Sequence, residues 1–234
     1  MLKKIKKFFE PINTKYLYQS QELIFSKQLE NLIPNLKNDF LKVHGNLEYL
    51  TPKKFDSSIP FHGQEQKSGW RSVGIKFYHK WEKSQKDLEK LYPTAHKLAK
   101  LFGDDCALAT YSLLRPGGKI SLHNGKDHNY DSAYLRIHIP LIIPDGDTDI
   151  LGFEIMGQRI GWKNILAINN TGLHQVYNKT SDHRLIFILD VHKSVLGQSP
   201  NYENMFQNRK LESLRLHLNR IIRIIYFNFF NKKS

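Results

Sequence analysis

The chain lacks most of the features that would place it outside the ordinary globular proteins. Cys106 is its single cysteine, which excludes a disulfide framework and a multi-cysteine metal cluster. Nine prolines and fourteen glycines are too few for a collagen-like or low-complexity chain. No run of about 18 apolar residues occurs, so no transmembrane helix is expected. The basic start has no apolar stretch after it, so no secretory signal peptide is expected, and a cytoplasmic location is predicted.

Positive charge is what the chain has in excess. Its 234 residues carry a formal net charge of +13, and 40% of them are hydrophobic, enough to build a sizeable core. The excess sits at the two ends: MLKKIKKFF opens the chain, and Glu212 is the single acidic residue between Asn208 and Ser234. Such an excess of positive charge favours binding to nucleic acid, to an anionic membrane surface or to an acidic substrate. No signature of a nucleic-acid-binding fold accompanies it, so nucleic acid is not expected as a partner.

Hydrophobic spacing divides the chain into three predicted regions. Residues 1–65 are expected to be helical or irregular, with a helical spacing from Glu22 to Leu32 and with Pro34, Pro52 and Pro60 punctuating the rest of the region. Residues 66–195 are predicted to form a β domain. Residues 196–234 form a third region in which the spacing is helical again.

The central region favours strands. VGIKFY at 73–78 alternates, and residues 83–102 then favour a helix in which Pro93 starts a new segment. From 107 to 191, turn sequences separate short runs rich in β-branched and aromatic residues: ALATYSLL, KISLH, YLRIHIPLII, NILAIN, HQVY and RLIFILDV. The predicted fold is mainly β with flanking helices, built on a double-stranded β-helix, the jelly-roll or cupin-like core.

The C-terminal region predicts a basic amphipathic helix. Its apolar stripe consists of Leu214, Leu218, Ile221, Ile222, Ile225 and Phe229. Arginines lie beside this stripe, so the helix could meet an anionic membrane at the inner face of the bilayer. The alternative is that the stripe packs on the protein's own core. The sequence leaves both open.

Three histidines and two arginines of the β region could carry chemistry. Alternation puts Ser121 and His123 on one face of a strand, and Arg136 and His138 on one face of another. His174 and Arg184 each begin a strand. Neutral imidazoles bind Fe, Zn, Cu or Ni, and arginine grips a carboxylate with two hydrogen bonds. A metal beside such an arginine favours an oxo-acid cosubstrate.

The third metal ligand is missing from its usual position. Many iron oxygenases use two histidines and a carboxylate, which often lies two residues after the first histidine. That position is Gly125 here, and Asp127 lies close by at a different spacing.

Four segments together resemble one known family. SLLRPGGKISLHNG, YLRIHIPLIIP, HQVYN and RLIFILDVH are similar, in order and spacing, to the aspartyl/asparaginyl β-hydroxylases. The likeness covers roughly residues 70–192. It implies a jelly-roll dioxygenase that depends on Fe(II) and 2-oxoglutarate. It also implies that His123 and His174 are the catalytic iron ligands, and that Gly125 agrees with the family, which characteristically has glycine in place of the carboxylate.

The same resemblance implies a cosubstrate pocket. Arg184, ten residues after His174, would pair with a carboxylate of 2-oxoglutarate, and Ser112 would contact it through its hydroxyl. Arg136 and His138 match the family's Arg-x-His pair in this pocket.

The substrate is left open by the sequence. One branch of the family hydroxylates aspartyl or asparaginyl side chains of peptides or amino acids, and we expect this activity. SGWRSVGIKFYHKW at 68–81 is similar to a second branch, the lipid A acyl-chain 2-hydroxylases. The long segment between His123 and Arg136, and the asparagines at 169 and 170, depart from the family near the expected substrate mouth. A further alternative is a non-catalytic jelly-roll module that binds membranes.

Overall fold

The computed structural model describes residues 15–45, 69–77, 80–81, 85–125 and 133–193. The chain divides into two units, Met1–His192 and Lys193–Ser234. The predicted C-terminal helix and the basic start of the chain lie outside the described residues. None of the helices in the described ranges combines the length and hydropathy needed to cross a bilayer.

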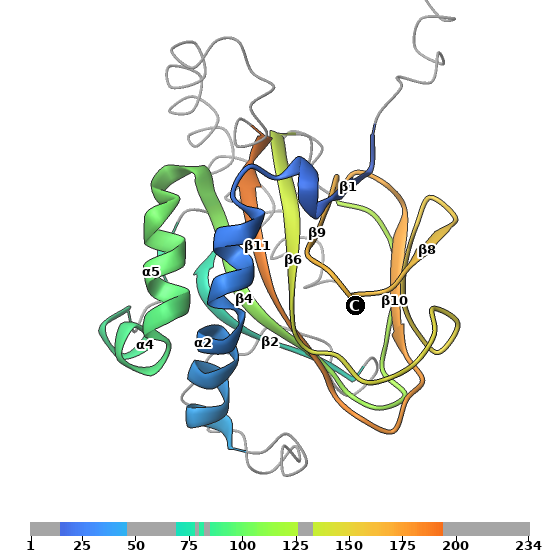
Figure 1. Cartoon of the computed structure of the whole chain (residues 1–234), viewed down its shortest axis with the longest axis horizontal. Coiled ribbons are helices and arrows are strands. Elements are labelled where there is room, and N and C mark those ends of the chain that lie inside the picture. The colour runs from blue at the N-terminus through green and yellow to red at the C-terminus, as the bar shows by residue number, and fades with distance from the viewer. Residues whose placement is uncertain (1–14, 46–68, 78–79, 82–84, 126–132, 194–234) are drawn as a thin grey trace, which may run out of the picture. The chain divides into compact units, whose positions relative to one another are not determined.

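Two antiparallel sheets form the core of the first unit (Figure 1). The larger sheet has the order β1 (Leu17–Gln19), β9 (Leu166–Ile168), β6 (Tyr134–Ile142), β11 (Arg184–His192), β4 (Cys106–Leu114), β2 (Trp70–Phe77) and β3 (Lys80–Trp81). The smaller sheet has the order β5 (Lys119–His123), β10 (His174–Asn178), β7 (Leu151–Ile155) and β8 (Gln158–Ile160). Successive strands from β4 to β7 alternate between the sheets, which confirms the predicted jelly roll.

Helices cover the outer face of the larger sheet (Figure 1). They are α2 (Ser26–His44), α4 (Gln85–Leu91) and α5 (Pro93–Leu101), with short 3-10 turns η1 (Ser20–Glu22) and η3 (Gly103–Asp105). The predicted new helix at Pro93 is confirmed. Phe40 of α2 lies with its ring 5.1 Å from that of Tyr111 on β4, and the Tyr111 hydroxyl donates to the Leu36 carbonyl. Aromatic packing therefore fixes α2 on the sheet.

Helix α2 continues through Pro34, so the prediction that Pro34 punctuates the chain is wrong. Proline inside a helix removes one backbone hydrogen bond and costs about 3 kcal/mol. Leu29, Leu36 and Phe40 lie on both sides of Pro34 and are buried. Burying each such side chain contributes about 1.5–3 kcal/mol, which is enough to offset the proline.

Along the central strand β11, side chains alternate between the face covered by the helices and the face toward the barrel interior. Leu185 and Phe187 face the helices, and the Phe187 ring lies 4.8 Å from Tyr111. Ile186 and Ile188 face the interior between the sheets, within its apolar core. Arg184 and Asp190 have the same parity as these isoleucines, so the strand places two buried charges inside the barrel.

Candidate active site

Two histidines from neighbouring strands face each other at one end of the barrel. His123 ends β5 and His174 begins β10, and they are register partners. Their ring centroids are 4.2 Å apart. Antiparallel pairing therefore brings together two imidazoles that lie far apart in the sequence.

A β-bulge aims His123 into the barrel. His123 pairs with His174, and Ile120 pairs with Val176. Between these two pairs β5 advances by three residues and β10 by only two. Ile120 packs on the interior core, and the extra residue turns His123 to the same side. The predicted shared face of Ser121 and His123 is therefore wrong. The bulge leaves Leu122 58% exposed.

Backbone carbonyls fix the tautomer of both rings. His123 Nδ1 lies 2.7 Å from the Ser121 carbonyl oxygen, and His174 Nδ1 lies 2.8 Å from that of Gly172. A carbonyl can only accept, so each Nδ1 carries the proton and each Nε2 keeps its lone pair. Burial, with smaller contributions from His123 and Arg136, lowers the pKa of His174 to about 4. His174 is therefore neutral near pH 7, as a metal ligand must be.

Backbone occupies the position where a third ligand is usual. The Gly125 amide donates to the Asn170 carbonyl at 2.7 Å, which ties the segment after β5 to the segment before β10. Across the described ranges, no group of three or more His, Cys, Asp or Glu side chains is gathered for a metal. Asp127 lies outside those ranges. The donor set fits a metal that takes two imidazoles and leaves several positions to other ligands.

Arg184 is a buried cation with little to balance it. The residue is 1% exposed at the start of β11. Its Nη1 donates to the Ser112 carbonyl at 3.4 Å, its Cζ lies 4.8 Å from the Trp162 ring centroid, and its buried Nε has no partner. Burial lowers its pKa to about 9. Within the described part of the chain no carboxylate pairs with it, so the site suits an anionic ligand.

Ser112 lies beside this arginine on β4, where it is the register partner of Ile186 and is almost fully buried. The indole Nε1 of Trp70 donates to the Ser112 hydroxyl oxygen at 2.9 Å. Because the oxygen is the acceptor there, the hydroxyl hydrogen can be donated to a ligand carboxylate.

Arg136 has a different environment. It is the register partner of Asp190, and its Nε and Nη2 donate to the two Asp190 carboxylate oxygens at 2.8 and 2.7 Å. Its Nη1 reaches the Asn170 side-chain oxygen at 3.4 Å. This bidentate pair holds the guanidinium in one orientation while the side chain stays 23% exposed.

His138 connects these groups inside the barrel. Trp162 Nε1 donates to its Nδ1 at 3.2 Å, so the neutral ring carries its proton on Nε2. Burial, followed by the charges of Arg136, Arg184 and His174, holds the pKa of His138 well below its usual value. The Phe153 ring lies 5.4 Å from that of His138 and 5.6 Å from that of His174, and Trp162 contacts both His138 and Arg184. Together with the histidine pair and the contact of Arg184 with Ser112, these contacts link the predicted site residues in one region.

Three further residues belong to this region, and the sequence analysis did not select them. Asp190 holds Arg136, Trp70 orients Ser112, and Trp162 contacts both Arg184 and His138. Asp190 could have been found, because it continues the inward parity of Arg184 on β11. No comparable pattern in the sequence points to Trp70 or Trp162.

The whole site region falls within one family model. The description "Aspartyl/Asparaginyl beta-hydroxylase" matches residues 34–194, which is more than half of the chain. The chain belongs to the aspartyl/asparaginyl β-hydroxylase family. It is accordingly a hydroxylase of the 2-oxoglutarate-dependent dioxygenase class, whose members generally use Fe(II) and 2-oxoglutarate.

Two solved structures are distantly similar to this β-hydroxylase family member. A prolyl-4-hydroxylase from Pseudomonas putida is 11% identical with a TM-score of 0.42, over 76% of this chain and 93% of that one. A 2OG-Fe(II) oxygenase family oxidoreductase from Burkholderia pseudomallei is 11% identical with a TM-score of 0.38, over 57% and 71%. No curated protein matches the sequence. The family assignment therefore rests on the matched family model.

Proposed function

We propose that the protein hydroxylates an aspartyl- or asparaginyl-type side chain of a peptide or amino acid, with Fe(II) held by His123 and His174 and 2-oxoglutarate held by Arg184 and Ser112. The observation that carries the proposal is the pairing of two Nε2-free imidazoles with a buried, unbalanced arginine in one barrel. When bound, Fe(II) and 2-oxoglutarate supply the oxidation of an unactivated C–H bond.

The chain's own residues supply binding and orientation. Arg184 would take one carboxylate of the cosubstrate, because a charge that lacks a partner in the interior gains most from an anion. Ser112 would donate its hydroxyl hydrogen to the same carboxylate while Trp70 fixes its oxygen. His138, with a proton on Nε2, and Arg136, fixed by Asp190, would complete the pocket as donors.

A lipid acyl chain is the alternative substrate, and the basic C-terminal region favours it. That region would hold the enzyme at the inner face of an anionic membrane. A peptide or amino acid is favoured by the family and by Arg136, a partly exposed cation that can meet a substrate carboxylate or amide. Arg136 contacts Asn170, which also accepts from the amide of Gly125, two residues after His123.

The test is substrate-dependent turnover in the purified full-length protein. With Fe(II), 2-oxoglutarate and oxygen, we expect succinate release together with a mass gain of one oxygen on an Asn- or Asp-containing peptide. His123→Ala and His174→Ala should each lose turnover by at least about a thousandfold, the scale of removing a catalytic group.

His183→Ala is the matched control, because His183 lies in the turn after β10, at the strand end opposite His174. It should keep turnover near the wild-type value. Succinate release that survives in both site variants would contradict the assignment. Oxygen incorporation into an acyl chain, with none into peptides, would replace the proposed substrate by the lipid.

A further inference from the structure

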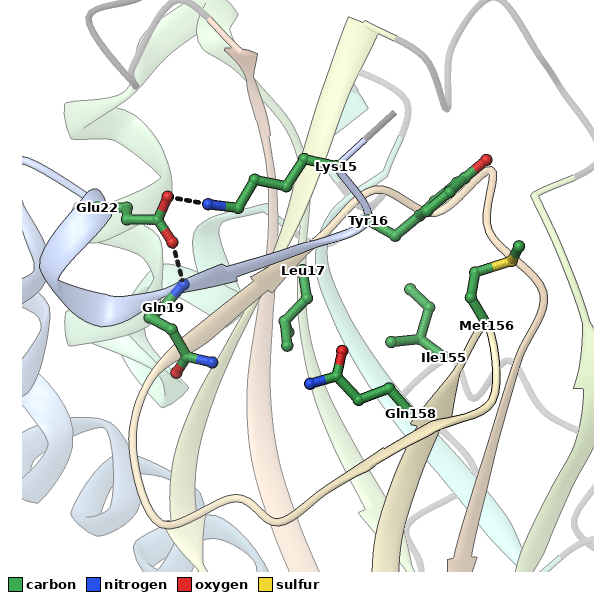
Figure 2. A pocket seen from close by; sticks show the side chains of 8 residues that line it. All are labelled: Lys15, Tyr16, Leu17, Gln19, Glu22, Ile155, Met156 and Gln158. Atoms are coloured by element: carbon green, nitrogen blue, oxygen red, sulfur yellow. Dashed lines mark hydrogen bonds and ion pairs between the residues drawn. The ribbon is translucent and has the colours of Figure 1, made fainter. Parts of the chain in front are cut away.

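A cavity of about 400 Å³ lies between β1, with the residues next to it, and the β7–β8 hairpin (Figure 2). Six residues form most of its lining: Tyr16, Leu17, Gln19, Ile155, Met156 and Gln158. Figure 2 shows the side chains of Leu17, Ile155 and Gln158 converging on it.

Strand register ties this cavity to the site. Ile155 is the partner of His174, and His174 is the partner of His123, so these three residues form one row across the smaller sheet. Adjacent strands are about 4.8 Å apart, so Ile155 lies one strand spacing from the histidine pair.

The larger sheet has a corresponding row. Leu17 pairs with Ile168, Ile168 with Arg136, and Arg136 with Asp190. The cavity is thus lined by one residue of each of two rows, which also contain the histidine pair and the Arg136–Asp190 ion pair.

The lining is apolar where it meets the core between the sheets, and its polar side chains at the rim are mostly uncharged. Leu17 and Ile155 belong to, or pack on, the apolar core between the sheets, and Met156 is 54% exposed at the rim. Gln19 and Gln158 contribute uncharged amides. The one charged pair, Lys15 with Glu22, is internally neutralised, and Glu22 also accepts from the Gln19 amide nitrogen. A charged group entering the cavity would have to compete with this ion pair for a counter-ion.

Strand β1 also offers a place for a backbone. It is the terminal strand of the larger sheet in the described residues, and terminal strands accept an added extended segment. The hairpin turn at Met156 and Gly157 has positive φ values of 49° and 80°, and it holds Met156 over the cavity. The Met156 amide donates to the Leu173 carbonyl, one residue before His174.

We infer that this cavity is a substrate subsite that takes a large apolar side chain of an extended peptide whose hydroxylated residue sits at the histidine pair. The inference rests on the proposed function, which it makes more specific. An extended chain advances about 3.3 Å per residue and alternates its side chains, so the residue two positions from the target reaches about 6.6 Å away on the same side. That distance is enough to cross the single inter-strand spacing between His174 and Ile155, which lines the cavity.

The test uses labelled peptides with a central Asn and with Phe, Ala or Glu two positions before or after it. Binding to the full-length protein is measured by fluorescence anisotropy, which does not depend on turnover. We expect Phe on one side of the Asn to bind at least about tenfold tighter than Ala, the effect of burying an aromatic side chain, and Glu to give no gain.

Two variants link this preference to the cavity. Met156→Glu and Gln158→Glu each put a charge on the neutral wall, and each should remove the advantage of Phe over Ala. Leu101→Glu is the matched control: Leu101 is 79% exposed on α5, and this variant should keep the preference.

Equal binding of the Phe and Ala peptides by the wild-type protein would overturn the inference. So would an unchanged preference in both cavity variants, or displacement of the peptide by a free fatty acid with no Phe preference. The proposed function fails differently, by absence of succinate release with peptides that do bind. The two failures can therefore be told apart.

Discussion

Two arginines inside the barrel have opposite environments. Arg136 is balanced by the two oxygens of Asp190, whereas Arg184 has an unpartnered Nε and a π-face contact with Trp162. A buried charge without a partner costs several kcal/mol, so a fold that keeps one usually serves a ligand. The difference explains why Arg184 is assigned to the carboxylate of the cosubstrate, whereas Arg136 only completes the pocket.

Replacing Arg184 by Met should separate binding from stability. The Kd for 2-oxoglutarate should rise at least about 30-fold, because losing one partner of a buried charged pair costs about 2–5 kcal/mol. The ligand-free protein should be as stable as the wild type or more so, since an unbalanced buried charge is removed. Anaerobic titration and thermal unfolding measure the two effects. A Kd within twofold of wild type would remove Arg184 from the cosubstrate pocket.

His44 gives the fold a pH dependence remote from the site. It lies at the end of α2, hydrogen-bonded at 2.7 Å to the Tyr92 hydroxyl, and burial lowers its pKa to about 4. Between pH 6.5 and 4 the unfolded chain therefore binds a proton that the folded chain does not. Stability should fall with falling pH in this window, by up to about 1.4 kcal/mol per pH unit for this group.

Urea unfolding at a series of pH values tests this account. His44→Phe keeps a ring beside Phe40, whose centroid lies 4.3 Å from that of His44, but cannot titrate. We expect a shallower slope of unfolding free energy against pH in the variant. An identical slope would show that His44 does not contribute.

At the scale of elements, strands with strong local patterns were predictable. KISLH matches β5 in full, and the runs at β4, β6, β10 and β11 agree within a residue or two, because turn sequences bound them. Strands β7 and β8 were missed: LGFEI and QRI are short, and their pairing depends on a hairpin turn with Met at positive φ. The bulge in β5 was also missed, because it exists only against β10.

Tyr16, the residue before strand β1, packs against the segment that holds His174. The Gly172 carbonyl accepts from His174 Nδ1, and a Cβ on Gly172 would lie 2.6 Å from the Tyr16 ring. Gly172→Ala should therefore displace this carbonyl and weaken Fe(II) binding about tenfold, the effect of disturbing a group that orients a metal ligand.

Tyr16→Ala in the same chain should restore part of the affinity, because it removes the obstacle. Gly161→Ala is the control, since its nearest neighbour would be at an ordinary 3.7 Å. Anaerobic Fe(II) titration measures all three variants. Equal Fe(II) affinities of the Gly172→Ala and Gly161→Ala variants would show that the contact between Tyr16 and Gly172 does not position His174.

At the scale of the whole molecule, the sequence predicted a set of candidate site residues but not the residues that contact them. His123, His174, Ser112 and Arg184 each stand in a predicted strand, at a position that the family resemblance selects. Trp70, which donates to Ser112, and Asp190, which accepts from Arg136, depend on register between strands distant in sequence, which no local pattern encodes.

The +13 charge is a property of the full chain, and its ends lie outside the described residues. The predicted membrane contact of the C-terminal region therefore stays a prediction. Vesicles with anionic lipid should bind the protein, and Arg215→Gln, Arg220→Gln and Arg223→Gln together should weaken binding, at about 1 kcal/mol for each charge removed. Binding that is insensitive to these changes and to salt would contradict it.

The central claim is that His123 and His174 hold Fe(II) and that Arg184 holds 2-oxoglutarate beside it. The most direct measurement is the visible charge-transfer band that forms when Fe(II) and 2-oxoglutarate are added together without oxygen. We predict a band in the wild-type protein, no band in His123→Ala or His174→Ala, and a band in Arg184→Met only at much higher 2-oxoglutarate. A wild-type protein with no band, or a band of equal strength in the histidine variants, would contradict the account.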